Sequence, residues 1–262
     1  MPKTAILISD VHAPLHDEKA VKVLFKAIPI IKPDIAVIMG DFAEMHSINA
    51  YQWARRKRPP LEYIEKALKD ELVKVNKMLD EFDAVFKKNG IKEKHFLIGN
   101  HEDRLERFCE ENPTDGIQDR YTTPIAFRLE ERGYKVYGCG EHMKLDKCKL
   151  NLYHGQHIGT ELHTKAHLTK YSEDVAYAHR HGVQRFAMGG FNGLRRAYSL
   201  GCLKSIKHED NQWLHGRPHS WEHAFGILHM FQDRGHNYRL EIVDMNNGET
   251  VVYGKHIKVG GK

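Results

Sequence analysis

The sequence lacks the features of a membrane or secreted protein. Its 262 residues contain no run approaching the roughly 18 apolar residues that a membrane-spanning helix needs. The amino-terminal segment leads into a predicted strand and does not have the layout of a signal peptide. The cysteines, Cys109, Cys139, Cys148 and Cys202, show neither close pairing nor Cys-x-x-Cys spacing, so we expect reduced, mostly packed thiols. These absences predict an intracellular protein without disulfides.

Internal repeats, low-complexity tracts and linkers are also missing from the sequence, so we predict a single domain over residues 1–262. The net charge of +5 is too small to establish a nucleic-acid partner, although it suits a polyanionic substrate better than a cationic one. Basic residues are concentrated in Arg55-Arg56-Lys57-Arg58. A solvated basic surface explains this run at least as well as a phosphate-binding rim does.

The most informative pattern is a set of polar groups that directly follow short apolar runs. The groups are Asp10-x-His12, Gly40-Asp41, Gly99-Asn100-His101-Glu102, His154-Gly155 and His179-x-His181. The runs before them, residues 5–8, 35–39, 96–98, 150–153 and 175–177, predict buried strands. Ligands bind beyond the strand ends in layered α/β folds, so we expect these residues to converge on one crevice. Their side chains are typical of a metal site.

Helices are predicted between these strands and antiparallel strands after them. Apolar residues at helical spacing predict one helix before Pro33, a long core-facing helix from Leu61 to Phe86, and a third from Arg104 to Glu111. Residues 224–228, 240–244 and 250–253 read as strands, and Asn247-Gly248 predicts a hairpin between the last two. The fold class is therefore α/β.

The ordered set of five groups resembles the calcineurin-like metallophosphoesterase superfamily. That family has the pattern Asp-x-His, Gly-Asp-x-x-Asp, Gly-Asn-His-Asp/Glu, His and Gly-His-x-His, which this chain matches from Asp10 to His181. Ala178 stands where the last motif has glycine. Arg104 after the third motif resembles phosphoesterases encoded by phages, which would place the protein in the cytoplasm or in the cytoplasm of a host. The resemblance implies two packed β-sheets flanked by helices, an αββα sandwich.

The resemblance also implies a centre of two divalent metal ions. Position by position, it assigns Asp10, His12 and His181 to the first metal, Asn100, His154 and His179 to the second, and Asp41 as the bridge between them. A shell of oxygen and nitrogen donors suits Mn, Fe, Zn, Co or Ni better than Ca, and we expect Mn. Two cations about 3.5–4 Å apart can hold a bridging water, lower its pKa and place the hydroxide in line with phosphorus.

Further residues have roles in proton transfer and substrate binding by the same resemblance. His101 resembles the general acid of the family, and Glu44 occupies the position of the acidic residue that pairs with this histidine. Asn100 and Arg104 are candidates for binding the substrate phosphate, although Arg104 has Glu102, Asp103 and Glu106 as alternative salt-bridge partners. Other histidines that could line the crevice are His46, His142 and His157, most of which we expect to be structural.

We therefore predict a phosphodiesterase or nuclease that acts on nucleic acid or nucleotides, as a monomer or homodimer. Tyr51 and Trp53 before the basic run could stack a base, but a packed loop with a solvated basic end is the preferred interpretation. The alternatives are a phosphomonoesterase acting on a nucleotide, a polynucleotide end or a protein, and a non-catalytic interaction scaffold. His163 and His167, four residues apart, could form an additional metal site, but we expect them to be exposed instead.

Overall fold

Two β-sheets pack against each other in the computed structural model, which describes residues 2–54, 57–113, 116–157, 161–191, 193–231 and 237–260. The larger sheet has the order β10-β9-β1-β2-β3-β4. Its strands are β1 (Lys3–Ile8), β2 (Ile35–Ile38), β3 (Glu93–Leu97), β4 (Tyr134–Tyr137), β9 (Ala224–Met230) and β10 (Tyr238–Asp244). The first four are parallel, while β9 runs antiparallel to both of its neighbours, β1 and β10.

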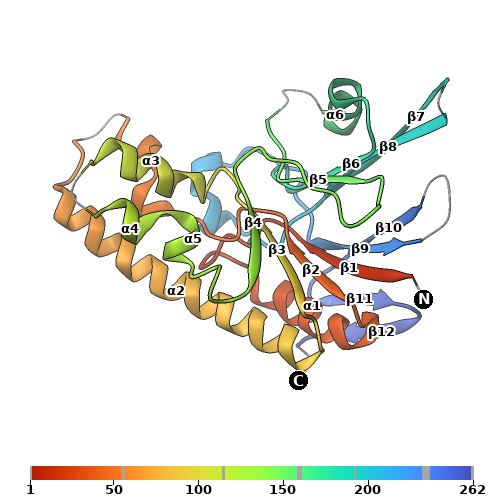
Figure 1. The fold of residues 1–262 in the computed structure, drawn as a ribbon. Helices are drawn as coiled ribbons and strands as arrows, with labels where there is room; N and C mark the ends of the chain where they lie inside the picture. The colour runs from red at the N-terminus through yellow and green to blue at the C-terminus, as the bar shows by residue number, and fades with distance from the viewer. Residues whose placement is uncertain are drawn as a thin grey trace.

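The second sheet has the order β5-β6-β8-β7 and lies over the first (Figure 1). Its strands are β5 (Asn151–Tyr153), β6 (Val175–Tyr177), β7 (Val183–Gly190) and β8 (Gly193–Leu200). Strands β5, β6 and β8 are parallel, and β7 forms an antiparallel hairpin with β8. Each of the five apolar runs singled out in the sequence therefore contributes to a parallel strand of one of these sheets.

Side chains along β1 alternate between its two faces, so this one strand contributes to two hydrophobic cores. Leu7 packs with Tyr153 and Tyr177 of the other sheet, whereas Ile6 and Ile8 face the helices on the opposite side. Because both faces are covered, the central strands are continuously apolar.

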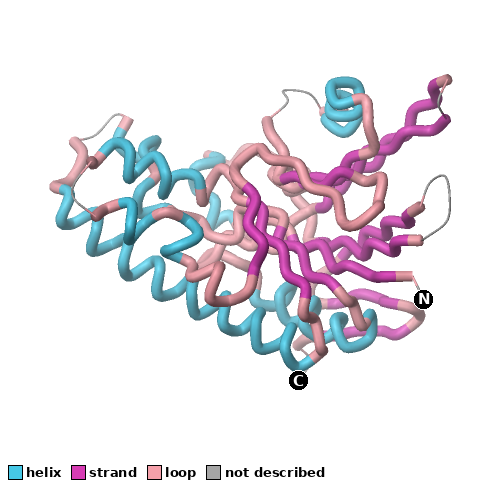
Figure 2. Tube along the Cα trace, in the orientation of Figure 1, coloured by secondary structure: helices cyan, strands magenta, loops and turns pink. Residues whose placement is uncertain are grey.

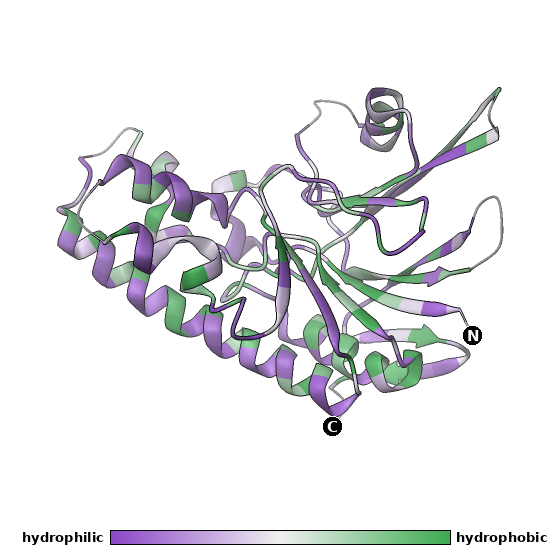
Figure 3. Cartoon of the chain, in the orientation of Figure 1, coloured by the Kyte–Doolittle hydropathy of each residue, from purple (hydrophilic) through white to green (hydrophobic). Residues whose placement is uncertain are grey.

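Helices α1 (Glu18–Ile31) and α2 (Leu61–Lys88) cover the outer face of the larger sheet, and α6 (His163–Tyr171) packs against the smaller one. Along α2 the predicted apolar stripe is buried while the other side is hydrophilic (Figure 3). The predicted fold class, an α/β protein with two packed sheets flanked by helices, is confirmed. No helix in the described parts of the chain is long and apolar enough to cross a membrane.

The predicted carboxy-terminal hairpin is wrong in its strand pairing. Asn247 and Gly248 do form a turn with positive φ, and strand β11 (Glu249–Val252) follows it. However, β11 pairs with β12 (Lys255–Lys258) in a separate two-stranded sheet, and β10 pairs with β9. The turn does close one antiparallel bridge between Asn246 and Glu249, but beyond it β11 contacts α1 and pairs with β12 rather than with β10.

The remaining helical segments lie beside the carboxyl ends of the parallel strands. They are η1 (His46–Ile48), η2 (Ala50–Trp53), α3 (Asp103–Glu111), α4 (Gln118–Tyr121), α5 (Thr123–Ala126) and η3 (His208–Leu214). Loops that follow the parallel strands gather on the side toward α3 (Figure 2). This end of the two sheets is where the polar groups of the sequence pattern meet.

Candidate metal centre

The polar groups of the five motifs converge at the carboxyl ends of β1, β2, β3, β5 and β6. Parallel strands end at the same edge of a sheet, and the two sheets present these edges on the same side. Asp10 is joined to the far motif by the backbone N–H of His179, which donates to its Oδ2 at 3.0 Å. Likewise, the N–H of His101 donates to Asp41 Oδ1 at 2.9 Å.

Several of these residues adopt a backbone conformation that non-glycine residues avoid. Positive φ angles between 48° and 64° occur at five of the seven positions that the resemblance assigns to metals: Asp10, His12, Asp41, His179 and His181. Each such residue costs on the order of 1–3 kcal/mol, and such strain is concentrated at functional sites. The fold therefore holds these side chains in place at a cost to its own stability.

Two glycines allow the second and third motifs to approach each other. A Cβ on Gly99 would lie 2.2 Å from Asp41 Oδ1, and one on Gly40 would lie 2.5 Å from His154 Nδ1. Gly40 also has a φ of +92°. Any side chain at either position would displace Asp41 or His154, which explains the glycines of both motifs physically.

Glu102, the last residue of the third motif, forms hydrogen bonds to the backbone of both turns. Its buried carboxylate accepts hydrogen bonds from the backbone N–H groups of Asp41 (2.9 Å), Ala43 (2.8 Å) and Gly99 (2.8 Å). Burial, followed by the charge of Asp41, raises the pKa of Glu102 to about 7. We call these three hydrogen bonds the Glu102 clamp. They were not predicted, because backbone amides leave no signature in the sequence.

The first cluster consists of Asp10, His12 and His181. The Nε2 atoms of the two histidines lie 3.1 Å apart, and Asp10 Oδ1 lies 3.3 Å from His181 Nε2 and 3.9 Å from His12 Nε2. All three residues are buried. Their donor atoms therefore face one small volume, with one atom from each side chain within 4.8 Å of the others.

The second cluster consists of Asp41, His154 and His179, with Asn100 beside it. Asn100 Oδ1 lies 2.7 Å from His179 Nδ1 and 3.1 Å from His154 Nε2. Asp41 Oδ2 is 3.3 Å from His154 Nε2 and 3.8 Å from His12 Nε2 of the first cluster. Asp41 therefore lies between the two clusters, and all seven residues that the resemblance singled out are brought together.

Hydrogen bonds on the far side of two rings orient their inward-facing nitrogens. His154 Nδ1 lies 2.9 Å from the carbonyl oxygen of Met39, so Nδ1 carries the proton and donates it. His12 Nδ1 lies 2.7 Å from Glu44 Oε2, which fixes that ring in the same way. Burial opposes charge on His154, but the charge of Asp41 outweighs it and raises the pKa of His154 to about 10. Once Nε2 of either ring is deprotonated, its lone pair is directed into the cluster, as a metal ligand requires.

The balance of buried charge fits divalent cations. Asp10, Asp41, Glu44 and Glu102 are all buried, and the buried cations beside them among the described residues are the ring of His154 and Lys204, whose Nζ lies 2.6 Å from Glu44 Oε2. Buried carboxylates are stable only when paired or when they coordinate metal. Burial opposes charge on Asp41, but attraction from the protonated ring of His154 outweighs it and holds the pKa of Asp41 well below its ordinary value. The donor set therefore fits two metal ions chemically.

His101 is placed at the centre, but its expected partner differs. Its Nδ1 donates to the backbone carbonyl of Glu44 at 2.7 Å, whereas Glu44 Oε1 is 3.8 Å away. The carboxylate of Glu44 is occupied by His12 and Lys204. Glu44 therefore contacts His101 through its backbone carbonyl, and its side-chain carboxylate orients the ring of His12 instead. Lys204 was not predicted, since it lies outside every motif.

Arg104 contacts none of its three predicted salt-bridge partners within 4 Å in the described parts of the chain. Its Nη1 donates to the carbonyl oxygen of Glu44 at 2.8 Å, and its Nη2 lies 3.0 Å from His101 Nε2. Burial lowers the pKa of His101, so its ring is neutral and accepts this bond. Arg104 is therefore positioned at the centre by neutral partners, and its positive charge is available to an anion.

A cavity of about 440 Å³ opens onto these residues. It is lined by His12, Glu44, His101, Arg104, His181 and Lys204 on the inside, and by His46, Asn49, Tyr51, Gln52 and Trp213 toward its mouth. Of the other histidines considered, His142 stacks on Tyr153, and His157 bonds to Arg180 at 2.9 Å. Ala178 is buried without a positive φ, so a methyl group fits there.

The exposure predicted for His163 and His167 is wrong, because both rings are buried between α6 and the smaller sheet. His163 Nδ1 lies 2.6 Å from the hydroxyl of Tyr177, and His167 hydrogen-bonds to the hydroxyl of Tyr153. The ring of His167 also stacks on Tyr177, with centroids 3.8 Å apart. Neither residue belongs to a cluster of metal-ligand type in the described residues.

These two rings predict acid sensitivity of the fold. The pKa of each is lowered to about 4, that of His163 by burial and then Arg180, and that of His167 by burial and then His163. In the unfolded chain a histidine titrates near pH 6.5, so between about 6.5 and about 4 the unfolded state binds more protons. Above this window the neutral rings of His163 and His167 contribute to the free energy of unfolding, and this contribution is lost as the pH falls through the window.

The His167→Phe variant keeps a ring on Tyr177 but cannot take up a proton. We expect its free energy of unfolding, measured by urea titration in EDTA, to fall less steeply than that of the wild type between about pH 6.5 and about pH 4. The exposed His256 provides the control variant His256→Gln, which should follow the wild type. If the free energy of unfolding fell equally steeply with pH in wild type and His167→Phe, the buried ring of His167 would not be the cause of the acid sensitivity.

Comparisons with known proteins identify the family of the chain. The model of the family described as calcineurin-like phosphoesterase matches residues 3–254. The Gene 54 protein of Mycobacterium phage L5 is 22% identical over 271 residues, which covers 97% of this chain and 98% of that protein.

Solved structures include Vacuolar Protein Sorting 29 from Cryptosporidium parvum, with 12% identity, a TM-score of 0.49 and coverage of 98% of this chain and 99% of that chain. Yfce, a phosphoesterase from E. coli, has 15% identity, a TM-score of 0.41 and coverage of 98% and 100%. The family model spans nearly the whole sequence, and on that basis the chain belongs to the calcineurin-like phosphoesterase family.

Proposed function

We propose that the protein is a metal-dependent phosphodiesterase that acts on nucleic acid or nucleotides. The observation that carries the proposal is the convergence of two donor clusters, Asp10–His12–His181 and Asp41–His154–His179, with Asp41 between them. Asn100 completes the second cluster. When bound, two divalent cations, for which we propose Mn²⁺, would supply an activated water and neutralise the phosphoryl oxygens.

The protein's own side chains would complete the reaction. Arg104 would bind a non-bridging phosphate oxygen through its planar fork, which has no carboxylate partner within 4 Å in the described residues. Its movement toward the phosphate would free Nε2 of His101. Nε2 would then take up a proton from water, which the departure of the guanidinium charge favours, and deliver it to the leaving oxygen, while Nδ1–H stays bonded to the carbonyl of Glu44.

A diester is favoured over a monoester because a second cavity adjoins the one at the centre. The cavity at the metal centre shares Asn49, Tyr51 and Arg104 with a second cavity that extends along α3. A site that is closed beyond the phosphate accepts only a monoester. An adjoining cavity has room for the second ester substituent of a diester.

The substrate class is tested with purified protein and Mn²⁺. We expect hydrolysis of bis(4-nitrophenyl) phosphate to exceed that of 4-nitrophenyl phosphate, followed by cleavage of single- or double-stranded nucleic acid. Protein treated with EDTA should be inactive and recover when Mn²⁺ is restored. Turnover of the monoester without hydrolysis of any diester would contradict the proposal and support a phosphomonoesterase, while no turnover of either ester would favour an interaction scaffold.

A further inference from the structure

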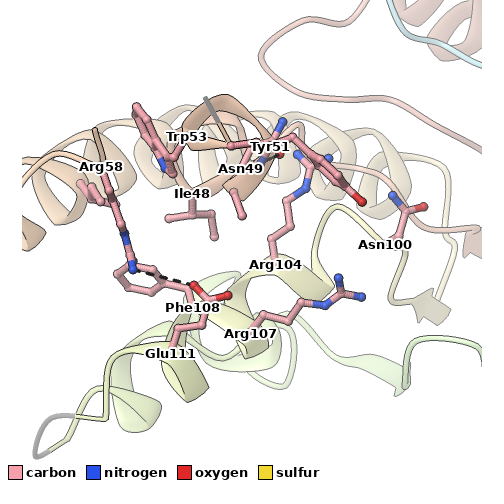
Figure 4. A pocket seen from close by; sticks show the side chains of 13 residues that line it. Ile48, Asn49, Tyr51, Trp53, Arg58, Asn100, Arg104, Arg107, Phe108 and Glu111 are labelled. Atoms are coloured by element: carbon pink, nitrogen blue, oxygen red, sulfur yellow. Dashed lines mark hydrogen bonds and ion pairs between the residues drawn. The ribbon is translucent and has the colours of Figure 1, made fainter. Parts of the chain in front are cut away.

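The cavity next to the metal centre has walls of two different kinds. It encloses about 460 Å³, within the range of roughly 300–1,000 Å³ found for ligand pockets. Figure 4 shows Tyr51 and Trp53 of η2 on one side and Arg107, Phe108 and Glu111 of α3 on the other, with Arg104 between them. We call this cavity the flanking pocket. Arg55 and Arg56 of the basic run lie outside the described residues, but Arg58 lines the pocket.

The cations of the flanking pocket are accessible and only partly neutralised. The side chains of Arg58 and Arg107 are 42% and 63% exposed. Arg107 pairs with Asp103 at 2.7 Å, whereas Arg58 is 4.0 Å from Glu111 and bonds to the amide oxygen of Asn112. Together with Arg104, three guanidinium groups face two carboxylates. The pocket therefore has an excess of positive charge.

The aromatic side chains do not form the packed loop that the sequence suggested. Tyr51 is 84% exposed, and Trp53 is half-buried in the wall of the flanking pocket. A single exposed aromatic residue on a surface needs no explanation. The exposed Tyr51 and the half-buried Trp53 beside three arginines provide both elements of single-stranded nucleic-acid binding, which are ring faces for bases and cations for phosphates.

The flanking pocket adjoins the cavity at the metal centre, and the two share Asn49, Tyr51 and Arg104 in their walls. Asn100 and Arg104 both line the flanking pocket, and both contact histidines of the centre. If one phosphate of a polynucleotide lies at the metal centre, the strand would therefore pass over Arg104, and its next nucleotide would enter the flanking pocket.

We propose that the flanking pocket binds the nucleotide next to the scissile phosphodiester of a single-stranded nucleic acid. Its base stacks on Trp53 or Tyr51, and its further phosphate pairs with Arg58 and Arg107. This assignment rests on the proposed function, because it takes the metal centre as the place of cleavage.

The test measures binding separately from hydrolysis. A fluorescein-labelled oligothymidylate is titrated with the full-length protein in EDTA, and fluorescence anisotropy gives Kd. We expect Trp53→Ala to raise Kd about tenfold, because stacking contributes about 1–3 kcal/mol per base. The control Phe191→Ala removes an exposed ring at the β7–β8 hairpin and should leave Kd unchanged. Thermal unfolding of Trp53→Ala shows whether it is folded.

A second variant tests the phosphate contacts by salt dependence. Each contact to a single strand contributes about 0.7 to the slope of log Kd against log salt, so Arg58→Gln/Arg107→Gln should reduce it by about 1.4. The control Arg239→Gln, on β10 at the other edge of the larger sheet, should keep the slope of the wild type. Arg58 and Arg107 are exposed surface residues, so this double variant remains informative even if Trp53→Ala unfolds.

The outcomes separate this inference from the proposed function. Unchanged Kd in folded Trp53→Ala and an unchanged salt slope in the double arginine variant would overturn the flanking pocket, even if the wild type hydrolyses bis(4-nitrophenyl) phosphate. No binding of the oligonucleotide by the wild type would overturn it as well. Weakened binding in the variants of a protein that hydrolyses no ester would support the pocket while contradicting the proposed function.

Discussion

Asp41→Asn is expected to abolish hydrolysis of bis(4-nitrophenyl) phosphate, with a fall in kcat/KM of about a thousandfold or more. Asp41 lies between both clusters, with Oδ2 at 3.3 Å from His154 Nε2 and 3.8 Å from His12 Nε2. An amide keeps the shape but loses the negative charge and one of the two oxygens. Loss of two-metal stabilisation removes several kcal/mol from the transition state, and each 1.36 kcal/mol is about tenfold in rate.

Asp119→Asn is the matched control, because it makes the same chemical change on exposed α4. It should retain full activity. The Asp41 variant should remain folded, since the Glu102 clamp on its backbone N–H is unaffected by the side chain. Near-normal turnover by folded Asp41→Asn would show that the side chain does not bridge two metals.

The second large effect is expected for His101→Gln, which should lower kcat by about 10²–10⁴-fold while metal binding persists. The ring contacts the carbonyl oxygen of Glu44 and the guanidinium of Arg104, and its Nε2 lies 4.0 Å from Asp41 Oδ2. His101 is in neither of the two clusters that contain Asp10 and Asp41, although its ring forms a third group of possible ligands with His12 and Glu44. A substrate with a better leaving group needs less protonation, so the loss of kcat should be smaller for it.

His256→Gln serves as the control here too, because that ring is exposed on β12. Titration calorimetry with Mn²⁺ should give the same number of ions for His101→Gln and wild type. An unchanged kcat for slow and fast leaving groups would exclude His101 as the proton donor. Loss of bound metal in the variant would instead make it a ligand.

The sequence was sufficient for the main layers and for the convergence of the site. Buried parallel strands leave continuous apolar runs, and the polar residues after them mark one edge of a sheet, as Asp10 and Asp41 illustrate. Strand β4 was missed because Tyr134–Tyr137 is a short edge strand with a lysine in it. The β7–β8 hairpin was missed because much of it is exposed and has no clear alternation.

Interactions that depend on backbone atoms or on distant segments were not predictable. Glu102 binds three backbone N–H groups, and His101 bonds to a main-chain carbonyl, so neither contact depends on a motif of side chains. Lys204 reaches Glu44 across 160 positions of sequence. Burial of His163 and His167 was missed because their neighbours Tyr153 and Tyr177 offer hydroxyl partners, which make a polar ring acceptable inside.

The central claim is that the converged side chains form a centre for two metal ions. Titration calorimetry of EDTA-stripped wild-type protein with Mn²⁺, together with elemental analysis after desalting, measures this directly. We expect two ions bound per chain, and fewer than two in Asp41→Asn because the carboxylate of Asp41 lies between the two clusters. One ion or none bound to the folded wild-type protein would contradict this claim.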